Sequence, residues 1–191
     1  MAVLEALIVR RAYRALKTDP IPSEVLLRLV EAAHLAPSSG NNQPWRIITV
    51  VNETILEELK TTLSRGNYWA QRAPAIAAFV TNPEWSLVMG DRQYAPFELG
   101  MAAMAYQMQA FAEGLYAHPI AGFNAQAAKE VLNIDEKNIL KTLIILGYPG
   151  DVAALNEKHQ ELEHSVQVRK PLEEVATFDT WNSKLNPFKK N

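Results

Sequence analysis

Two short basic clusters hold the residues of this sequence best suited to bind an anion. The first contains Arg10, Arg11 and Arg14, and the second contains Arg169 and Lys170. Guanidinium groups form paired hydrogen bonds with phosphate and carboxylate oxygens. The formal net charge of −2 gives the whole chain no attraction for nucleic acid or an anionic membrane. Local clusters of this kind therefore favour a small anionic ligand.

The first cluster, taken alone, is better interpreted as a solvated helix end. Leu4, Leu7 and Ile8 recur at helical spacing, so a helix is expected to run to about Arg14. Arg10 and Arg14 would then share a face at its C-terminus, where the helix dipole tolerates cations. The phosphate-binding interpretation therefore needs support from elsewhere in the sequence.

A polar loop over residues 36–45 lies between an amphipathic helix and an apolar strand. Pro37 and Pro44 block the continuation of regular structure near its two ends. Gly40 and the neighbouring Asn41 and Asn42 permit backbone conformations that other residues resist. Small and amide-bearing residues dominate this loop, so its composition predicts that it wraps a polar ligand.

Helices and strands are expected to alternate along most of the chain. Apolar periodicity predicts helices at about residues 23–36, 54–63, 94–113, 124–132 and 156–164, and strands at about 46–51, 75–81, 115–120 and 140–147. Ser23 is the expected N-cap of the first of these helices. The alternation favours a layered α/β domain, although two successive helices at the start do not assure a doubly wound sheet. We expect one domain over residues 1–191, with a core at about 1–151 and an extension at about 152–191.

Several functions are disfavoured by what the sequence lacks. It has no cysteine, which removes disulfides, thiolate metal sites, iron–sulfur clusters and cysteine nucleophiles together. His159 and His164 are poorly spaced for two ligands on one helix face, so no metal site is predicted. The sequence shows no dinucleotide-binding or Walker motif, no signal peptide and no apolar run of membrane-spanning length. We therefore expect a cytoplasmic protein that binds neither membranes nor nucleic acid.

Over about residues 8–176, the motifs resemble those of the FMN-dependent nitroreductase family. Arg-Arg-x-x-Arg at residues 10–14 is followed by Pro-Ser-Ser-x-Asn-x-Gln-Pro-Trp at residues 37–45. This combination at this spacing is similar to the opening pattern of the family. The long Ala- and Met-rich helix expected at 94–113 resembles the family's central dimer helix, where its methionines would pack.

Later motifs extend the resemblance in the same order along the chain. Gly-Asn-Tyr-Trp at 66–69, with Ala-Pro at 73–74, is similar to the family's segment beside the flavin ring. His-Pro-Ile-Ala-Gly-Phe at 118–123 is similar to its flavin-edge loop. Leu-Gly-Tyr-Pro at 146–149 and Arg-Lys-Pro-Leu at 169–172 resemble its last core strand and its closing basic motif.

The resemblance implies an α+β fold in which helices flank a mixed β-sheet. It also implies a homodimer that binds FMN in a groove at the subunit interface. Phe178, Trp181 and Phe188 stand among polar neighbours and have no core of their own, so the C-terminal tail is expected to pack either on its own domain or on a second subunit. The resemblance implies that it embraces the partner subunit.

The family pattern, carried over residue by residue, also implies how the cofactor is held. Arg10, Arg11 and Arg169 would hold the FMN phosphate. Arg14 would lie toward the pyrimidine end of the isoalloxazine ring, where a cation stabilises the negative charge that develops on reduction. The loop residues 37–39 would reach the FMN bound by the other subunit.

The opposite edge of the flavin would be contacted by residues from the middle of the chain. Asn67 would bond the amide edge of the ring, and the backbone N–H groups of Ala121 and Gly122 would face N5 and O4. The complete set of cofactor-binding residues expected on this basis is Arg10, Arg11, Ala12, Arg14, Pro37, Ser38, Ser39, Asn41, Asn67, Pro119, Ile120, Ala121, Gly122 and Arg169.

Three positions depart from the family pattern. Ala12 stands where many members have a serine that contacts the flavin, Trp69 stands near the position of a second cationic residue, and Ala121 replaces a glutamate found in some members. Arg14 alone would then supply positive charge beside the ring. FMN binding is still expected despite these changes, but they do not indicate which electron acceptor the protein prefers.

The activity implied is the NAD(P)H-dependent reduction of quinones, nitroaromatics or similar acceptors by a ping-pong mechanism. The flavin carries this chemistry, so no catalytic acid or base is named. Two alternatives stay open. One is a protein that senses or stores FMN without turnover. The other is a different flavin reaction on the same fold, such as dehalogenation, azole-forming dehydrogenation or flavin destruction.

Overall fold

The core of the protein is an antiparallel sheet. The computed structural model describes residues 3–185. Within them, the main sheet has four strands in the order β1-β2-β6-β5, which are β1 (Arg46–Val50), β2 (Ala75–Thr81), β5 (Tyr116–Ile120) and β6 (Ile139–Gly147). The α+β class is confirmed, although each pairing among the described strands is antiparallel and the sheet is not mixed.

Strands β2 and β6 occupy the centre of this sheet because their side chains are apolar on both faces. Every residue of β2 is buried, and so are residues 143–147 of β6. A short, continuous apolar run of this kind is typical of a fully buried strand. The hydroxyl of Thr81 is satisfied by donating to the backbone oxygen of Pro44 at 2.6 Å. The end of β2 is thereby tied to the polar loop over residues 36–45.

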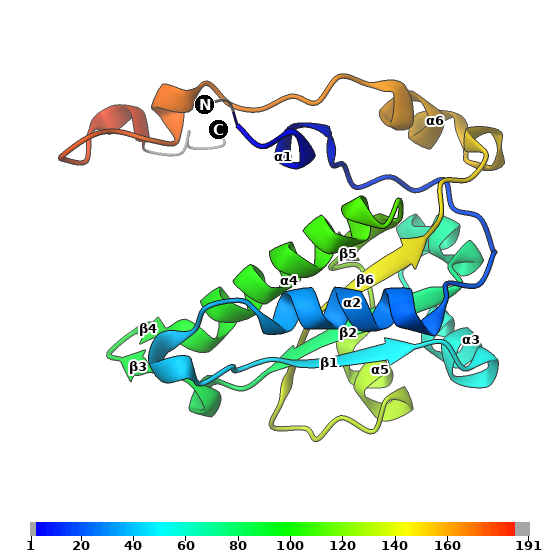
Figure 1. The fold of residues 1–191 in the computed structure, drawn as a ribbon, viewed down its shortest axis with the longest axis horizontal. Coiled ribbons are helices and arrows are strands. Elements are labelled where there is room, and N and C mark those ends of the chain that lie inside the picture. Colours follow the sequence, from blue (N-terminus) through cyan, green and yellow to red (C-terminus); the bar gives the residue numbers. More distant parts are fainter. Residues whose placement is uncertain (1–2, 186–191) are drawn as a thin grey trace.

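One face of the sheet is covered by two long helices (Figure 1). They are α2 (Ser23–His34) and α4 (Tyr94–Ala112), and their apolar residues pack on Ala77, Phe79 and Ile144. These residues lie on one side of β2 and β6, as the two-residue period of a strand requires.

The other face is covered by shorter elements. They are α3 (Glu53–Thr61), the 3₁₀ segment η2 (Arg65–Arg72) and α5 (Ala125–Val131), and they pack on Ile76 and Ala78 of β2. Because β2 serves both cores, no ligand can reach the centre of the sheet. The candidate site must therefore lie at an edge.

The first helix is shorter than the sequence predicts. Helix α1 covers Glu5–Val9, so the prediction that it continues to Arg14 is wrong. The apolar side chains of α1 are exposed in the described chain, and so short a helix gains little without packing. The backbone N–H groups of Arg14 and Ala15 donate to the carboxylate of Glu163, at 3.0 and 3.5 Å, instead of continuing a helical ladder.

Two further details differ from the sequence prediction. Helix α2 starts at Ser23, with Pro22 at its N-cap position and no side-chain cap. The N–H groups of Val25 and Leu26 already bond to the oxygen of Pro22, which moves the helix start one residue earlier than predicted. A hairpin of β3 (Val88–Met89) and β4 (Arg92–Gln93) was not predicted, because two-residue strands give no periodic signal.

The C-terminal arm leaves the sheet after β6 and passes through α6 (Glu157–His164). It then runs beside α1, away from the sheet (Figure 1). Its apolar side chains are mostly exposed, and Phe178 is 92% and Trp181 68% exposed. Phe188 lies outside the described residues. Beyond α6, the described part of the arm thus leaves most of its apolar side chains exposed, and its packing on a partner subunit stays a prediction.

No helix in the described part of the chain is long and apolar enough to cross a bilayer.

A short ladder fixes the chain that follows the arginine segment (residues 10–14). The N–H of Lys17 donates to the oxygen of Tyr148 at 2.9 Å, and the N–H of Gly150 donates to the oxygen of Ala15 at 2.8 Å. Gly150 allows this approach because a Cβ atom there would lie 2.4 Å from the carbonyl carbon of Leu16. These backbone contacts, made by residues 15 and 17 with the chain just after β6, therefore fix the position at which the arginine segment ends.

Gly150→Ala should disrupt this ladder. We expect the free energy of unfolding to fall by roughly 1–3 kcal/mol, because the added methyl group must displace backbone atoms. Gly66→Ala is the matched control, since a Cβ atom at Gly66 would meet nothing within 4 Å. Urea unfolding measures both variants, and equal stability of the Gly150 variant and the parent would contradict the prediction.

His118 of β5 also ties the arginine segment to the sheet. Its Nδ1 lies 3.1 Å from the oxygen of Tyr13, and its ring packs on Trp69 with the ring centroids 4.6 Å apart. A carbonyl only accepts, so Nδ1 is assigned the proton and donates it. Burial lowers the pKa of His118 to about 4 from its ordinary 6.5, and the positive charge of Arg14 acts in the same direction.

The stability of the protein should depend on the titration of His118. Below pH 6.5 the unfolded chain binds a proton at this residue, whereas the folded chain stays neutral until about pH 4. As the pH is lowered from 6.5 to about 4, the free energy of unfolding should therefore decrease. His118 contributes up to about 1.4 kcal/mol of this decrease per pH unit. His118→Asn keeps a donor without titrating and should flatten this dependence in urea unfolding. An equally steep slope in the His118 variant would refute the assignment.

Candidate functional site

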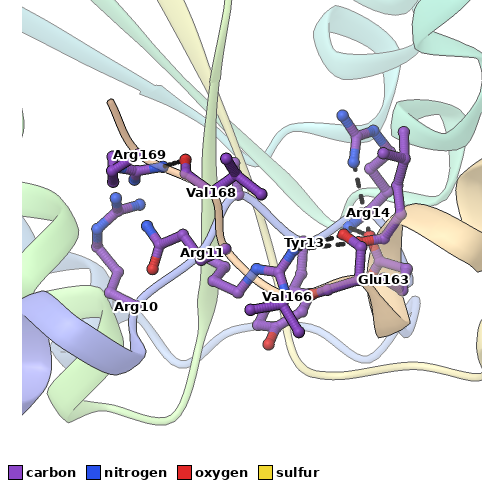
Figure 2. Close-up of a pocket in the computed structure, with 12 residues that line it drawn as sticks. Arg10, Arg11, Tyr13, Arg14, Glu163, Val166, Val168 and Arg169 are labelled. Atoms are coloured by element: carbon purple, nitrogen blue, oxygen red, sulfur yellow. Dashed lines mark hydrogen bonds and ion pairs between the residues drawn. The ribbon is translucent and has the colours of Figure 1, made fainter. Parts of the chain in front are cut away.

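A cavity of about 410 Å³ lies between the arginine segment and the start of the C-terminal arm (Figure 2). Its lining comes from two stretches far apart in sequence, residues 10–14 and residues 162–169. The predicted FMN-binding residues in this lining are Arg10, Arg11, Ala12, Arg14 and Arg169. The structure thus brings the two basic clusters together, and the first cluster is not the end of a helix.

Arg10 carries a buried donor that the protein does not satisfy. Its Nε is buried and has no hydrogen-bond partner among the described residues. Leaving a buried guanidinium N–H without an acceptor is unfavourable, so an oxygen atom is expected to meet it. Arg169 lines the same cavity. The donor set therefore fits an anionic group such as the phosphate of FMN.

Arg11 is largely engaged by the protein itself. Its guanidinium donates to the backbone oxygen of Ser165, to the backbone oxygen of Leu162 at 3.1 Å and to the hydroxyl of Ser165 at 3.2 Å. These acceptors lie at the C-terminal end of α6, where the helix dipole favours a cation. Arg11 therefore fastens the arm to the arginine segment, in addition to lining the cavity.

Arg14 lies beside a buried carboxylate. Its Nη1 is 3.7 Å from Oε1 of Glu163, and the side chains are 23% and 4% exposed, respectively. Figure 2 shows this pair at one end of the cavity lining, where Glu163 also accepts the backbone N–H of Arg14. Sequence reasoning missed Glu163, because one acidic residue in a polar helix gives no signal for burial or pairing.

Helix α6 also contacts η2, which carries the predicted flavin-edge residue Asn67. The hydroxyl of Tyr68 accepts the backbone N–H of Asn156 at 2.8 Å, and lies 3.1 Å from Nδ1 of His159. The rings of Tyr68 and His159 stack with their centroids 5.4 Å apart. One short helix therefore holds both the arginine segment and η2. His159, which the sequence suggested was a surface residue, makes one of these contacts.

The predicted flavin-edge residues form a second group. The amide nitrogen of Asn67 donates to the oxygen of Gly122 at 2.8 Å, and a Cβ atom at Gly122 would lie 2.5 Å from the hydroxyl of Ser64. Ile120 is buried in the core, so only its backbone is available to a ligand. Pro119 is half-buried and Ala121 is exposed. These residues adjoin the arginine segment through the contact of His118 with Tyr13.

The predicted loop residues Pro37, Ser38, Ser39 and Asn41 form a third group. The N–H of Ser39 donates to Oε1 of Glu98 at 2.7 Å. Glu98 is 2% exposed, and its other oxygen accepts the hydroxyl of Ser86 at 2.6 Å. Sequence reasoning also missed Glu98, although a carboxylate within an otherwise apolar helix is a detectable signal.

Figure 1 shows the loop that follows α2 beside β3 and β4, whereas the segments that line the cavity, residues 10–14 and 162–169, lie beside α1 and α6. The structure brings together the first and second groups of predicted residues and leaves the loop apart from them. This separation is the arrangement expected if the loop serves the site of another subunit.

Comparisons with known proteins show which family the chain is similar to. The profile of the nitroreductase family matches residues 7–148. An NADH dehydrogenase of Thermus thermophilus is 27% identical over 177 residues, which cover 76% of this chain and 86% of that protein. A solved structure described as an oxidoreductase containing FMN is 25% identical, with a TM-score of 0.85 over 95% of this chain and 94% of that one.

A shorter match points to a protein with a different activity. A 5,6-dimethylbenzimidazole synthase of Rhodospirillum rubrum is 51% identical over 41 residues, which cover 22% of this chain and 19% of that protein. The family profile, in contrast, spans most of the chain, and the solved structure covers nearly all of it. The chain therefore belongs to the nitroreductase family.

Proposed function

We propose that this protein binds FMN as a homodimer, takes reducing equivalents from NAD(P)H and passes them to quinone, nitroaromatic or similar acceptors by a ping-pong mechanism. Its family membership makes it a flavin oxidoreductase. The observation that carries the finer proposal is the buried, unpartnered Nε of Arg10 in a cavity also lined by Arg11, Arg14 and Arg169.

The residues of the cavity fit the two ends of FMN differently. Arg10 and Arg169 would bind the phosphate, since guanidinium groups match its oxygens in charge and geometry. Arg14 would hold a positive charge toward the ring. Asn67 and the backbone of Gly122 would contact the opposite edge, and the missing Cβ atom of Gly122 leaves room for the side chains of Ser64 and Asn67 that pack against it. When bound, FMN supplies the redox chemistry, for which protein side chains have no equivalent.

The proposed dimer rests on two observations. The N–H of Ser39 ties the loop at Ser38 and Ser39 to Glu98, but the loop lies away from residues 10–14 and 162–169, which line the cavity of its own chain. The arm exposes apolar side chains such as Phe178 and Trp181, whose burial on a partner would be favourable. A dimer in which each loop completes the partner's site would account for both.

Reduction by a nicotinamide nucleotide tests the enzyme proposal. Anaerobic mixing of the FMN-loaded protein with NADPH or NADH should bleach the flavin absorbance, and adding a quinone should restore it. Flavin that stays oxidised would favour the binding or sensing alternative. Bleaching that neither quinone nor oxygen reverses would instead indicate a reaction that consumes the flavin.

Arg10→Gln should weaken FMN binding by roughly 10- to 100-fold, which is the expected loss of a charge-assisted hydrogen bond to phosphate. Riboflavin, which has no phosphate, should bind the variant and the parent equally. Fluorescence titration of the apoprotein measures both ligands. Arg28→Gln is the matched control, because Arg28 pairs with Glu113 on the surface. An equal loss for riboflavin would show that the change disturbed the fold and not a phosphate contact.

A further inference from the structure

Glu163 is a buried acidic group that the proposed function does not use. Among the described residues that line the cavity, it is the only acidic one, whereas four are arginines. Its carboxylate receives the backbone N–H groups of Arg14 and Ala15 and lies 3.7 Å from the Arg14 guanidinium. Other acidic residues of α6, such as Glu161, are exposed.

Because Glu163 is buried beside the cavity, its charge affects the electrostatic potential there more strongly than a surface carboxylate would. Its side chain is 4% exposed, so water and salt screen its field poorly. The negative charge faces Arg14, the residue that the proposed function assigns to stabilise negative charge on the flavin ring. It therefore opposes the positive field of Arg14 within the cavity. Trp69, near the family's second cationic position, offers no compensating charge.

We propose that Glu163 tunes the flavin by offsetting the charge of Arg14, so that FMN bound in this cavity has a lower reduction potential than Arg14 alone would set. The inference deepens the proposed function and rests on it. A lower potential makes the reduced cofactor a stronger donor to acceptors and a weaker acceptor of electrons from NAD(P)H. Glu163 thus acts at a distance as a tuning residue and is not a catalytic acid.

A purely structural role for Glu163 makes a different prediction. The carboxylate also positions the backbone of residues 14 and 15, and glutamine can still accept the shorter of those two hydrogen bonds. Glu163→Gln therefore removes the charge while keeping the main positioning contact. A structural role would leave the potential of bound FMN unchanged, whereas a tuning role would raise it.

The test is the midpoint potential of FMN bound to the full chain, measured by anaerobic titration against a reference dye. Glu163→Gln should raise the potential and Arg14→Gln should lower it. The double variant should return close to the parent, because both opposing charges are gone. Glu161→Gln removes an equal charge from the solvent-exposed side of α6 and should leave the potential unchanged.

Two outcomes would overturn the inference. One is an unchanged or lower potential in Glu163→Gln with FMN retained, and the other is an equal rise in Glu161→Gln. If Glu163→Gln loses FMN, the double variant is compared with Arg14→Gln, and the double variant must have the higher potential.

The proposed function can fail independently of the role proposed for Glu163. A parent that holds FMN but is not reduced by NAD(P)H contradicts the enzyme proposal, while the dye titration still decides the role of Glu163. A parent that binds no FMN contradicts both.

Discussion

The backbone pairing of residues 15–17 with residues 148–150 is the contact on which the rest of the site depends. It joins the chain that follows the arginines to the end of β6, whose residues 143–147 are all buried. A glycine at 150 makes this approach possible, and His118 adds a side-chain contact to Tyr13 just before it. These contacts hold the extended arginine segment, residues 10–14, in place, and they thereby position its guanidinium groups.

Two buried glutamates, in different parts of the molecule, each hold an irregular segment by accepting one of its backbone N–H groups. Glu98 accepts the N–H of Ser39 and so holds the polar loop, while Glu163 accepts the N–H of Arg14 and so holds the arginine segment. A carboxylate oxygen accepts strongly from backbone donors, which stabilises irregular chain that no helix or strand supports. Both predicted ligand-binding segments are thus held by hydrogen bonds within the protein, and a segment that is already held loses less entropy on binding.

The cavity itself brings together charges that would repel each other without compensation. Arg11 is neutralised in part by the C-terminal carbonyls of α6, and Arg14 is offset by Glu163. Arg10 retains a buried donor that lacks a partner among the described residues. The two ends of the cavity therefore differ in charge. At one end the buried N–H of Arg10 can still bind an anion, and at the other end the charges of Arg14 and Glu163 offset each other.

The sequence by itself determined the central strands, the long helix and the family motifs. Short apolar runs with β-branched residues, such as 75–81, favour buried strands, and fixed spacings of Arg, Ser, Asn and Pro are local information. Only the tertiary structure decided that α1 ends at Val9, that Arg11 caps α6, and that Glu98 and Glu163 are buried partners of backbone groups. The physical reason is that these features depend on hydrogen bonds between polar groups that are more than 50 residues apart in the sequence. A helical pattern up to Arg14 gives way when its backbone donors find better acceptors in a distant helix.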